Sequence, residues 1–189
     1  MNNEVQSELK KILNTRFSQS ESTRLTYSRG EDTYDPILSK AVVFPETNEE
    51  VSKILKICNE NKIPVVPFGT GTSLEGNVLG NDQGITISLE KMNKILNVNV
   101  EDFDCKVQAC VTREQLNEYL REDGVFFPID PGANAAIGGM AATSASGTMA
   151  VKYGTMKTVI SGLTVVLPNG EIIKTGSRTK KTSAGYNLT

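Results

Sequence analysis

The feature that most constrains this chain is a loop rich in glycine and hydroxyl side chains that follows an apolar run. The run Ile63 to Val66 predicts a strand, and the next ten residues, Pro67 to Gly76, hold three glycines and three hydroxyl side chains but no basic residue. Glycine allows positive φ and close approach of the main chain, and successive N–H groups can converge on an anion. Each hydrogen bond to a charged acceptor contributes about 1.5–3 kcal/mol, so about four or five could hold a pyrophosphate without lysine.

The loop does not match the two most familiar phosphate-binding patterns. A Walker A loop requires lysine and then serine or threonine after its second glycine, but Asn77 and Val78 follow Gly76. A Rossmann fingerprint requires a third glycine where Leu74 stands. A glycine-rich surface turn is the alternative that the ten residues alone leave open.

Composition narrows the chemistry further. The formal net charge is −2, so we expect no nucleic-acid partner. The chain contains no histidine, which excludes histidine bases, histidine metal ligands and flavin attached through histidine. Its three cysteines form no C-x-x-C pair, so we expect neither a disulfide framework nor a metal site. No transmembrane segment is expected, and the expected location is cytoplasmic, with peripheral membrane association left open.

Hydrophobic periodicity and turn residues predict an alternating arrangement of helices and strands. Thr47 with Glu50, and Thr112 with Gln115, are capping boxes in which each pair satisfies two free N–H groups. Cys58 is expected in the core, Tyr119 inward, and the alternating strand 85–89 half-buried. The expected strands are residues 41–44, 63–66, 85–89, 95–100, 104–111, 125–127, 159–167 and 171–175, and the expected helices begin near Val5, Thr47 and Thr112.

A second segment, residues 138–147, is depleted in large side chains. It begins with Gly138 and Gly139 and ends with Gly147, and such a segment must lie close to a ligand or to another main chain. If the two glycines open a short helix, its N–H groups would suit a phosphate or the polar edge of a flavin. Tight packing of a helix on a sheet is the equally open alternative.

Five motifs in order resemble one family. They are the loop 67–76, the turn 130–133, the segment 138–147, the pair 153–154 and the stretch 183–189. Together they resemble the FAD-binding domain of the vanillyl-alcohol oxidase and p-cresol methylhydroxylase (PCMH-type) superfamily, in its D-lactate dehydrogenase and glycolate oxidase FAD-subunit branch. The resemblance covers roughly residues 40–189.

The resemblance implies a set of cofactor-binding residues and non-covalent FAD. The loop would hold the pyrophosphate, the turn after Asp130 would pass the flavin, and the later segments would line the dinucleotide. Catalytic residues are not identified. The implied cofactor-binding residues are Pro67, Phe68, Gly69, Thr70, Gly71, Thr72, Ser73, Pro131, Gly132, Ala133, Gly138, Gly139, Met140, Thr143, Ser146, Gly147, Tyr153 and Gly154.

The implied fold is α+β, with two α/β lobes. A small parallel-sheet lobe precedes a larger lobe with a mixed or antiparallel sheet, and FAD would lie between them. Residues 1–39 are expected to form a helical or extended lead-in. Residues 40–189 are expected to form the FAD-binding domain, which would be incomplete at its C-terminus, and the cap or substrate domain of the family would be absent.

The implied activity is oxidation of a D-2-hydroxy acid, D-lactate or glycolate, to the 2-oxo acid. A quinone, a cytochrome or a partner subunit would accept the electrons. The alternative is a non-catalytic flavin-binding fragment or interaction remnant. Lys152, Lys157 and Arg178 could steer an acidic substrate or the FAD phosphates, although a solvated surface role is favoured for each.

Overall fold

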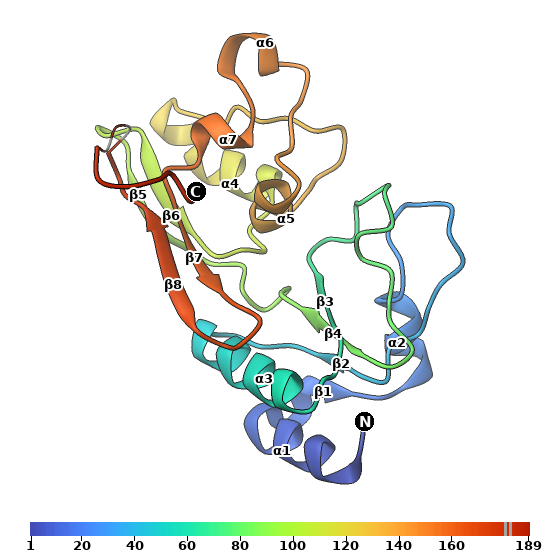
Figure 1. Ribbon diagram of the computed structural model, residues 1–189. Coiled ribbons are helices and arrows are strands. Elements are labelled where there is room, and N and C mark those ends of the chain that lie inside the picture. The colour runs from blue at the N-terminus through green and yellow to red at the C-terminus, as the bar shows by residue number, and fades with distance from the viewer. Residues whose placement is uncertain (180, 182) are drawn as a thin grey trace. The chain divides into compact units, whose positions relative to one another are not determined.

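The computed structural model describes residues 1–179, 181 and 183–189, and these form two compact units (Figure 1). Unit 1 comprises Met1–Met92 and Val166–Ile172. Unit 2 comprises Asn93–Val165 and Ile173–Thr189. The chain therefore returns to unit 1 once, through a short segment near its C-terminal end.

Unit 1 is built on a four-stranded sheet in the order β1-β2-β4-β3. Its strands are β1 (Phe17–Ser18), β2 (Val42–Val43), β3 (Val65–Phe68) and β4 (Ile85–Ser88). Strands β2 and β3 run parallel to β4, whereas β1 is antiparallel to β2. The parallel sheet expected from the sequence is therefore present, with the lead-in contributing its antiparallel edge.

The central strand β4 is more deeply buried than its sequence alternation predicts. All four of its residues are buried, so the half-buried expectation is wrong. The reason is that β4 has strands on both sides and that the hydroxyl of Thr86 is satisfied internally by the hydroxyl of Ser39, at 2.8 Å. The polar residue Thr86 in this alternating sequence therefore makes a buried hydrogen bond and does not face solvent.

Unit 1 also contains four helical elements, of which α1 and α3 contribute buried residues to its core. They are α1 (Asn3–Leu13), the 3₁₀ turn η1 (Asn14–Arg16), α2 (Glu21–Thr26) and α3 (Asn48–Glu60). Helices α1 and α3 contact each other (Figure 1). Leu9, Ile54 and Cys58 lie in the common core. Cys58 is 1% exposed, which confirms that it lies in the core as expected, and this burial raises the pKa of its thiol to about 11.

The capping box at α3 is half formed. The Thr47 hydroxyl accepts from the Glu50 N–H at 3.1 Å, as predicted. The Glu50 carboxylate does not return to Thr47 and instead accepts from the Glu46 N–H at 2.7 Å and from Arg16 at 2.5 and 2.6 Å. That part of the prediction is wrong, because a charged guanidinium is a stronger partner than an amide.

Unit 2 contains antiparallel pairing in place of parallel strands. Strand β5 (Ile95–Asn99) is antiparallel to β6 (Asp104–Val107), which confirms that these segments pair. The second strand ends at Val107, so the predicted range to residue 111 is too long. Strand β7 (Gly162–Val166) pairs with β8 (Ile172–Gly176) through the predicted hairpin, whose Gly170 has φ +81°. Within the described residues these pairs form two separate two-stranded sheets.

The helices of unit 2 are short and enclose two small apolar clusters. They are α4 (Arg113–Leu120), the 3₁₀ turn η2 (Arg121–Asp123), α5 (Ile137–Ala142), α6 (Ala150–Tyr153) and α7 (Met156–Val159). One cluster centres on Leu116 and the other on Met140. Helix α5 is the short helix expected at Gly138 and Gly139. The mixture of a parallel sheet with antiparallel pairs confirms the α+β class.

Two expectations in unit 2 are wrong. Tyr119 is 58% exposed rather than inward, because α4 presents Leu116 and Leu120 to the core. Residues 125–127 form no strand. The Asn117 side chain replaces a strand partner there, accepting from the Phe127 N–H at 2.7 Å and donating to the Phe127 carbonyl at 3.2 Å. Hydrophobic periodicity cannot predict that a side chain, here Asn117, makes the hydrogen bonds that a neighbouring strand would make.

Candidate functional site

The glycine loop of unit 1 begins where strand β3 ends at Phe68. Gly71 and Gly76 have φ of +74° and +71°, in the left-handed region that favours glycine. A Cβ added to Gly71 would lie 2.7 Å from the Cζ atom of the buried Phe68 ring. The loop therefore requires glycine at position 71 both for its backbone conformation and for its contact with Phe68.

The loop presents main-chain donors that the described part of the chain does not use. Among the described residues, the N–H groups of Gly69, Gly71, Thr72 and Ser73 donate no hydrogen bond. The hydroxyls of Thr70 and Thr72 lie 3.4 Å apart at the same rim. Because native structures rarely leave partly buried N–H groups unpaired, this set fits a ligand with several acceptor oxygens, such as a diphosphate.

The small residues of α5 in unit 2 divide into two kinds. The Gly138 N–H donates to the Ala109 carbonyl at 2.8 Å, and a Cβ on Gly138 would meet Ala109 Cβ at 2.8 Å. Gly138 therefore packs closely against the turn at Ala109, and its expected cofactor contact stays a prediction. A Cβ added to Gly139 would meet no atom within 4 Å, so this glycine leaves open space beside α5. Met140 is buried with Ile129 and Met156, so its side chain faces the core.

The acidic turn and the glycine segment of unit 2 are held together by Asp130. Its Oδ1 accepts from the Met149 N–H at 3.1 Å, and its Oδ2 accepts from the Thr148 hydroxyl at 2.5 Å. The bond from Thr148, followed by that from Met149, lowers the pKa of the Asp130 carboxyl below its ordinary value. A Cβ on Gly147 would overlap the carbonyl carbon and oxygen of Asp130, so the two main chains meet directly.

The hydrogen bond between Asp130 and Thr148 therefore joins the turn 130–133 to the end of the segment 138–147, and both contain predicted cofactor residues. Sequence reasoning did not assign either side chain to the site. The signal available was the position of Asp130 directly before Pro131 and Gly132, where a carboxylate can accept hydrogen bonds from a distant turn. Gly132 is exposed, with open space where a Cβ would stand, whereas Pro131 and Ala133 are partly buried.

The remaining predicted residues lie in turns around α5 and α6. The Thr143 hydroxyl donates to the Gly139 carbonyl at 3.1 Å, and Ser146 is exposed. The Tyr153 ring packs edge-on against Phe126 with centroids 5.6 Å apart. Gly154 has φ +82°, and a Cβ there would overlap the Thr158 hydroxyl. The cofactor contacts expected of these residues stay predictions.

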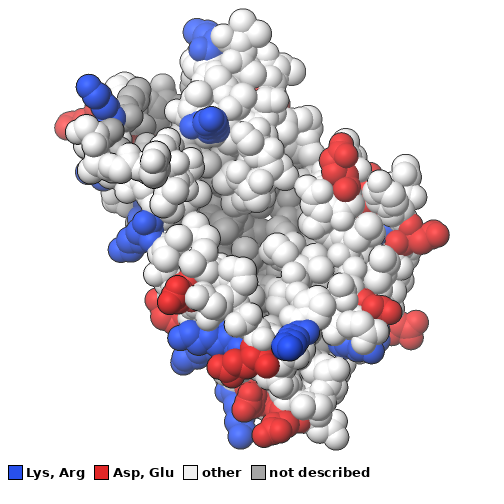
Figure 2. All heavy atoms as spheres, in the orientation of Figure 1, with Lys and Arg blue, Asp and Glu red and all other residues white. Residues whose placement is uncertain are grey.

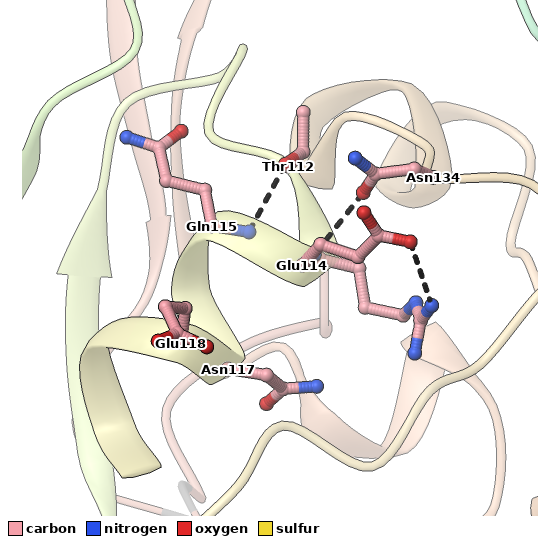
Figure 3. Close-up of a pocket in the computed structure, with 7 residues that line it drawn as sticks. Thr112, Glu114, Gln115, Asn117, Glu118 and Asn134 are labelled. Atoms are coloured by element: carbon pink, nitrogen blue, oxygen red, sulfur yellow. Dashed lines mark hydrogen bonds and ion pairs between the residues drawn. The ribbon is translucent and has the colours of Figure 1, made fainter. Parts of the chain in front are cut away.

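A shallow depression at the start of α4 contains none of the predicted cofactor residues (Figure 3). Figure 3 shows two backbone N–H groups of the first turn bonded to side chains of the depression: the Gln115 N–H donates to the Thr112 hydroxyl at 3.2 Å, and the Glu114 N–H donates to Asn134 Oδ1 at 3.1 Å. The depression is a capped helix end. It is lined by Thr112, Arg113, Glu114, Gln115, Asn117, Glu118 and Asn134.

Basic and acidic side chains are mixed on the part of the surface over α1 and α3, as Figure 2 shows. In unit 2, Arg178 donates to Asp102 at 2.6 Å and to Asp104 at 2.7 Å. Arg178 is therefore neutralised by two carboxylates, which supports the surface role favoured from the sequence over steering of an anion.

No helix in the part of the chain that the structure describes has both the length and the apolar character needed to cross a membrane.

Comparison with known proteins places these features in a family. The model of a family described as FAD binding domain matches residues 39–176. The chain is 45% identical over 98% of its length to the mitochondrial D-lactate dehydrogenase [cytochrome] of Arabidopsis thaliana, and 53% identical over 79% of its length to D-lactate dehydrogenase [cytochrome] 1 of Saccharomyces cerevisiae. It is 35% identical over 92% of its length to the glycolate oxidase subunit GlcD of Bacillus subtilis.

The matched relatives are considerably longer than this chain. The chain covers 33% of the Arabidopsis protein, 26% of the yeast protein and 37% of the Bacillus protein. It thus spans about a third of the length of these curated relatives, and the match lies in their FAD-binding part.

Solved structures show the same fold. An alkyldihydroxyacetonephosphate synthase superposes with a TM-score of 0.86 over 100% of this chain and 36% of that chain, at 23% identity. A p-cresol methylhydroxylase superposes with a TM-score of 0.69 over 92% of this chain and 35% of that chain, also at 23% identity. The chain belongs to the FAD binding domain family, with the PCMH-type fold and the FAD cofactor that its motifs predicted.

Proposed function

We propose that this chain is the FAD-binding part of an oxidoreductase that converts a D-2-hydroxy acid, D-lactate or glycolate, to the 2-oxo acid. The observation that carries the proposal is the identity of 45% and 53% to proteins named D-lactate dehydrogenase, together with 35% identity to a glycolate oxidase subunit. The unpaired amides of the glycine loop provide an independent reason to expect a diphosphate-containing cofactor.

In this proposal, the chain's own residues bind and orient the cofactor. The N–H groups of Gly69, Gly71, Thr72 and Ser73 in unit 1 donate to the diphosphate oxygens. Asp130 keeps the turn at Gly132 and the segment at Gly147 in register. FAD, when bound, supplies the capacity to accept a hydride equivalent from the substrate carbon.

The first experiment is an FAD titration of the wild-type chain and of Gly71→Val, followed by the visible flavin spectrum. The valine would clash with Phe68 and strain the left-handed backbone, so we expect FAD affinity to fall by about 100-fold or more. Asn77→Val, at a position just beyond the loop, is the matched control and should bind FAD as the wild type does. Retention of flavin by Gly71→Val at wild-type affinity would contradict the assignment of the loop.

The substrate class is tested on the full-length protein. Oxidation of D-lactate, glycolate and L-lactate is followed with an artificial dye, and then with cytochrome c or a quinone as acceptor. We expect turnover of D-lactate or glycolate, and we propose a cytochrome as acceptor because two of the relatives are named for one. Turnover of L-lactate alone would contradict the proposed substrate class.

A further inference from the structure

A segment of the lead-in, residues 27–39, is fastened at both ends to the chain that follows the glycine loop. We name this segment the strap. Near its start, the carbonyl of buried Ser28 accepts from the Gly80 N–H at 2.9 Å. At its end, the hydroxyl of buried Ser39 accepts from the Asn81 N–H at 3.1 Å and pairs with Thr86. The strap is therefore held against the sheet of unit 1 rather than free in solvent.

Between these fixed ends, the strap lies against the glycine loop. A Cβ added to Gly30 would overlap the Ser73 carbonyl oxygen and would lie 3.0 Å from the Gly71 carbonyl oxygen. Further along, the Tyr34 ring lies 3.0 Å from the position of a Cβ on Gly76. The Asp32 carboxylate accepts from the Gly30 and Tyr34 N–H groups, at 3.1 and 3.0 Å, and so fixes the turn of the strap.

This contact determines which way the loop's peptide groups face. The carbonyls of Gly71 and Ser73 point toward Gly30. All peptide bonds described are trans, and in a trans peptide the N–H points opposite to the carbonyl. The N–H groups of Thr72 and Leu74 therefore point away from the strap. Neither donates a hydrogen bond within the described residues, and Leu74 adds a donor that the sequence did not predict.

An aromatic contact supports the other side of the loop. The Tyr27 ring packs edge-on against the Phe68 ring with centroids 5.1 Å apart. The Phe68 ring in turn lies 2.7 Å from the position that a Cβ on Gly71 would occupy, so only glycine fits there. The loop therefore contacts the strap at Gly30, and it also contacts the Phe68 ring, which packs against Tyr27 of the strap.

We propose that the strap is a positioning element of the cofactor site, with Gly30 as its critical residue, and that it turns the loop's carbonyls inward so that its amides face the FAD diphosphate. The inference rests on the proposed FAD binding by the loop. It assigns a function to residues that, apart from Ser39, precede the family match at residues 39–176. The strap acts through the loop and needs no contact with the cofactor itself.

The test compares Gly30→Ala with wild type in titrations with FAD and with riboflavin, which lacks phosphate. Gly30 lies outside the left-handed region, so alanine strains only the contact with the loop carbonyls. We expect the Kd for FAD to rise at least about tenfold, the loss of roughly one hydrogen bond to a charged oxygen, with the Kd for riboflavin unchanged. Glu31→Ala, at the exposed neighbouring position, is the matched control and should bind both as wild type.

The outcomes separate the strap's role from the proposed function. If wild type binds no FAD, the proposed function itself fails. If wild type binds FAD and Gly30→Ala binds it equally well, or loses FAD and riboflavin affinity in equal proportion, the strap proposal is overturned. Should Gly30→Ala fail to fold, Tyr34→Ala decides: removing this 54%-exposed ring should weaken FAD several-fold without affecting riboflavin, and unchanged FAD affinity would overturn the proposal.

Discussion

The glycine loop of unit 1 and the glycine segment of unit 2 are both poor in side chains, but different forces hold them. The loop is backed by neutral groups: the main chain of Gly30, the ring of Phe68 and buried serine hydroxyls. The segment around Gly147 is held by one carboxylate, Asp130, which accepts hydrogen bonds from Thr148 and Met149. Loops of similar composition are therefore held in two ways: the groups that touch the loop of unit 1 are neutral, whereas the segment of unit 2 is held by a carboxylate.

The difference also separates two uses of glycine. In unit 1, Gly71 adopts a positive φ and leaves amides unpaired, which is what an anion-binding loop requires. In unit 2, Gly138 and Gly147 allow the main chain to approach Ala109 and Asp130, so these glycines serve packing first. A count of glycines cannot distinguish these uses, whereas the contacts of each Cβ position can.

The largest expected effect on stability comes from filling the contact between Gly147 and Asp130. The Cβ of Gly147→Ala would overlap main-chain atoms of Asp130, which cannot move aside as a flexible side chain can. We expect the free energy of unfolding to fall by about 3 kcal/mol, measured by urea denaturation. Gly132→Ala, with nothing within 4 Å of its Cβ position, should cost less than about 1 kcal/mol. An equal loss of unfolding free energy for the two variants would contradict the distinction between glycines in close contact with another main chain and glycines beside open space.

A smaller effect tests the ionic support in unit 2. Because hydrogen bonds from Thr148 and Met149 lower the pKa of Asp130, its ionised form stabilises the fold above the ordinary carboxyl pKa of about 4, and this contribution is lost as pH falls through the lowered value. We expect Asp130→Asn to melt a few degrees below wild type at pH 7, with the gap narrowing below about pH 4.

The comparison with unit 1 provides the control for that measurement. The stability difference between Gly71→Ala and wild type should not change over the same pH range, because the atoms that a Cβ at Gly71 would meet belong to the neutral ring of Phe68. Arg113 is the charged neighbour that also acts on Asp130 and keeps its charge throughout. A gap for Asp130→Asn that stays constant from pH 7 to pH 3 would contradict the ionic account.

The sequence predicted the parts of this molecule that depend on local pattern. The helix begun by Thr47, the pairing of β5 with β6 and the turn at Gly170 follow from capping, alternation and the Asn-Gly signal. The prediction failed where buried polar groups pair: the hydroxyl of Ser39 pairs with Thr86 in the interior strand β4, and Asn117 replaces a strand partner for Phe127. Such interactions join residues far apart in sequence, which periodicity does not register.

The candidate site shows the same division. The loop at Gly71 was recognisable because glycine spacing and the missing lysine limit what can bind there. The strap, Asp130 and the Leu74 amide were not, because their roles come from contacts with the loop or the segment rather than from a motif of their own. Sequence motifs therefore identified the main chain expected to bind the cofactor, but the residues that hold this main chain in place could be found only in the three-dimensional structure.

The most direct test of the central claim is the amide NMR spectrum of the chain as FAD is added, with hydrogen exchange measured at each step. The account predicts that the N–H groups of Gly69, Gly71, Thr72, Ser73 and Leu74 shift and exchange more slowly when FAD binds, because they donate to the diphosphate. FAD binding that leaves these five amides unshifted and exchanging at their original rates would contradict it.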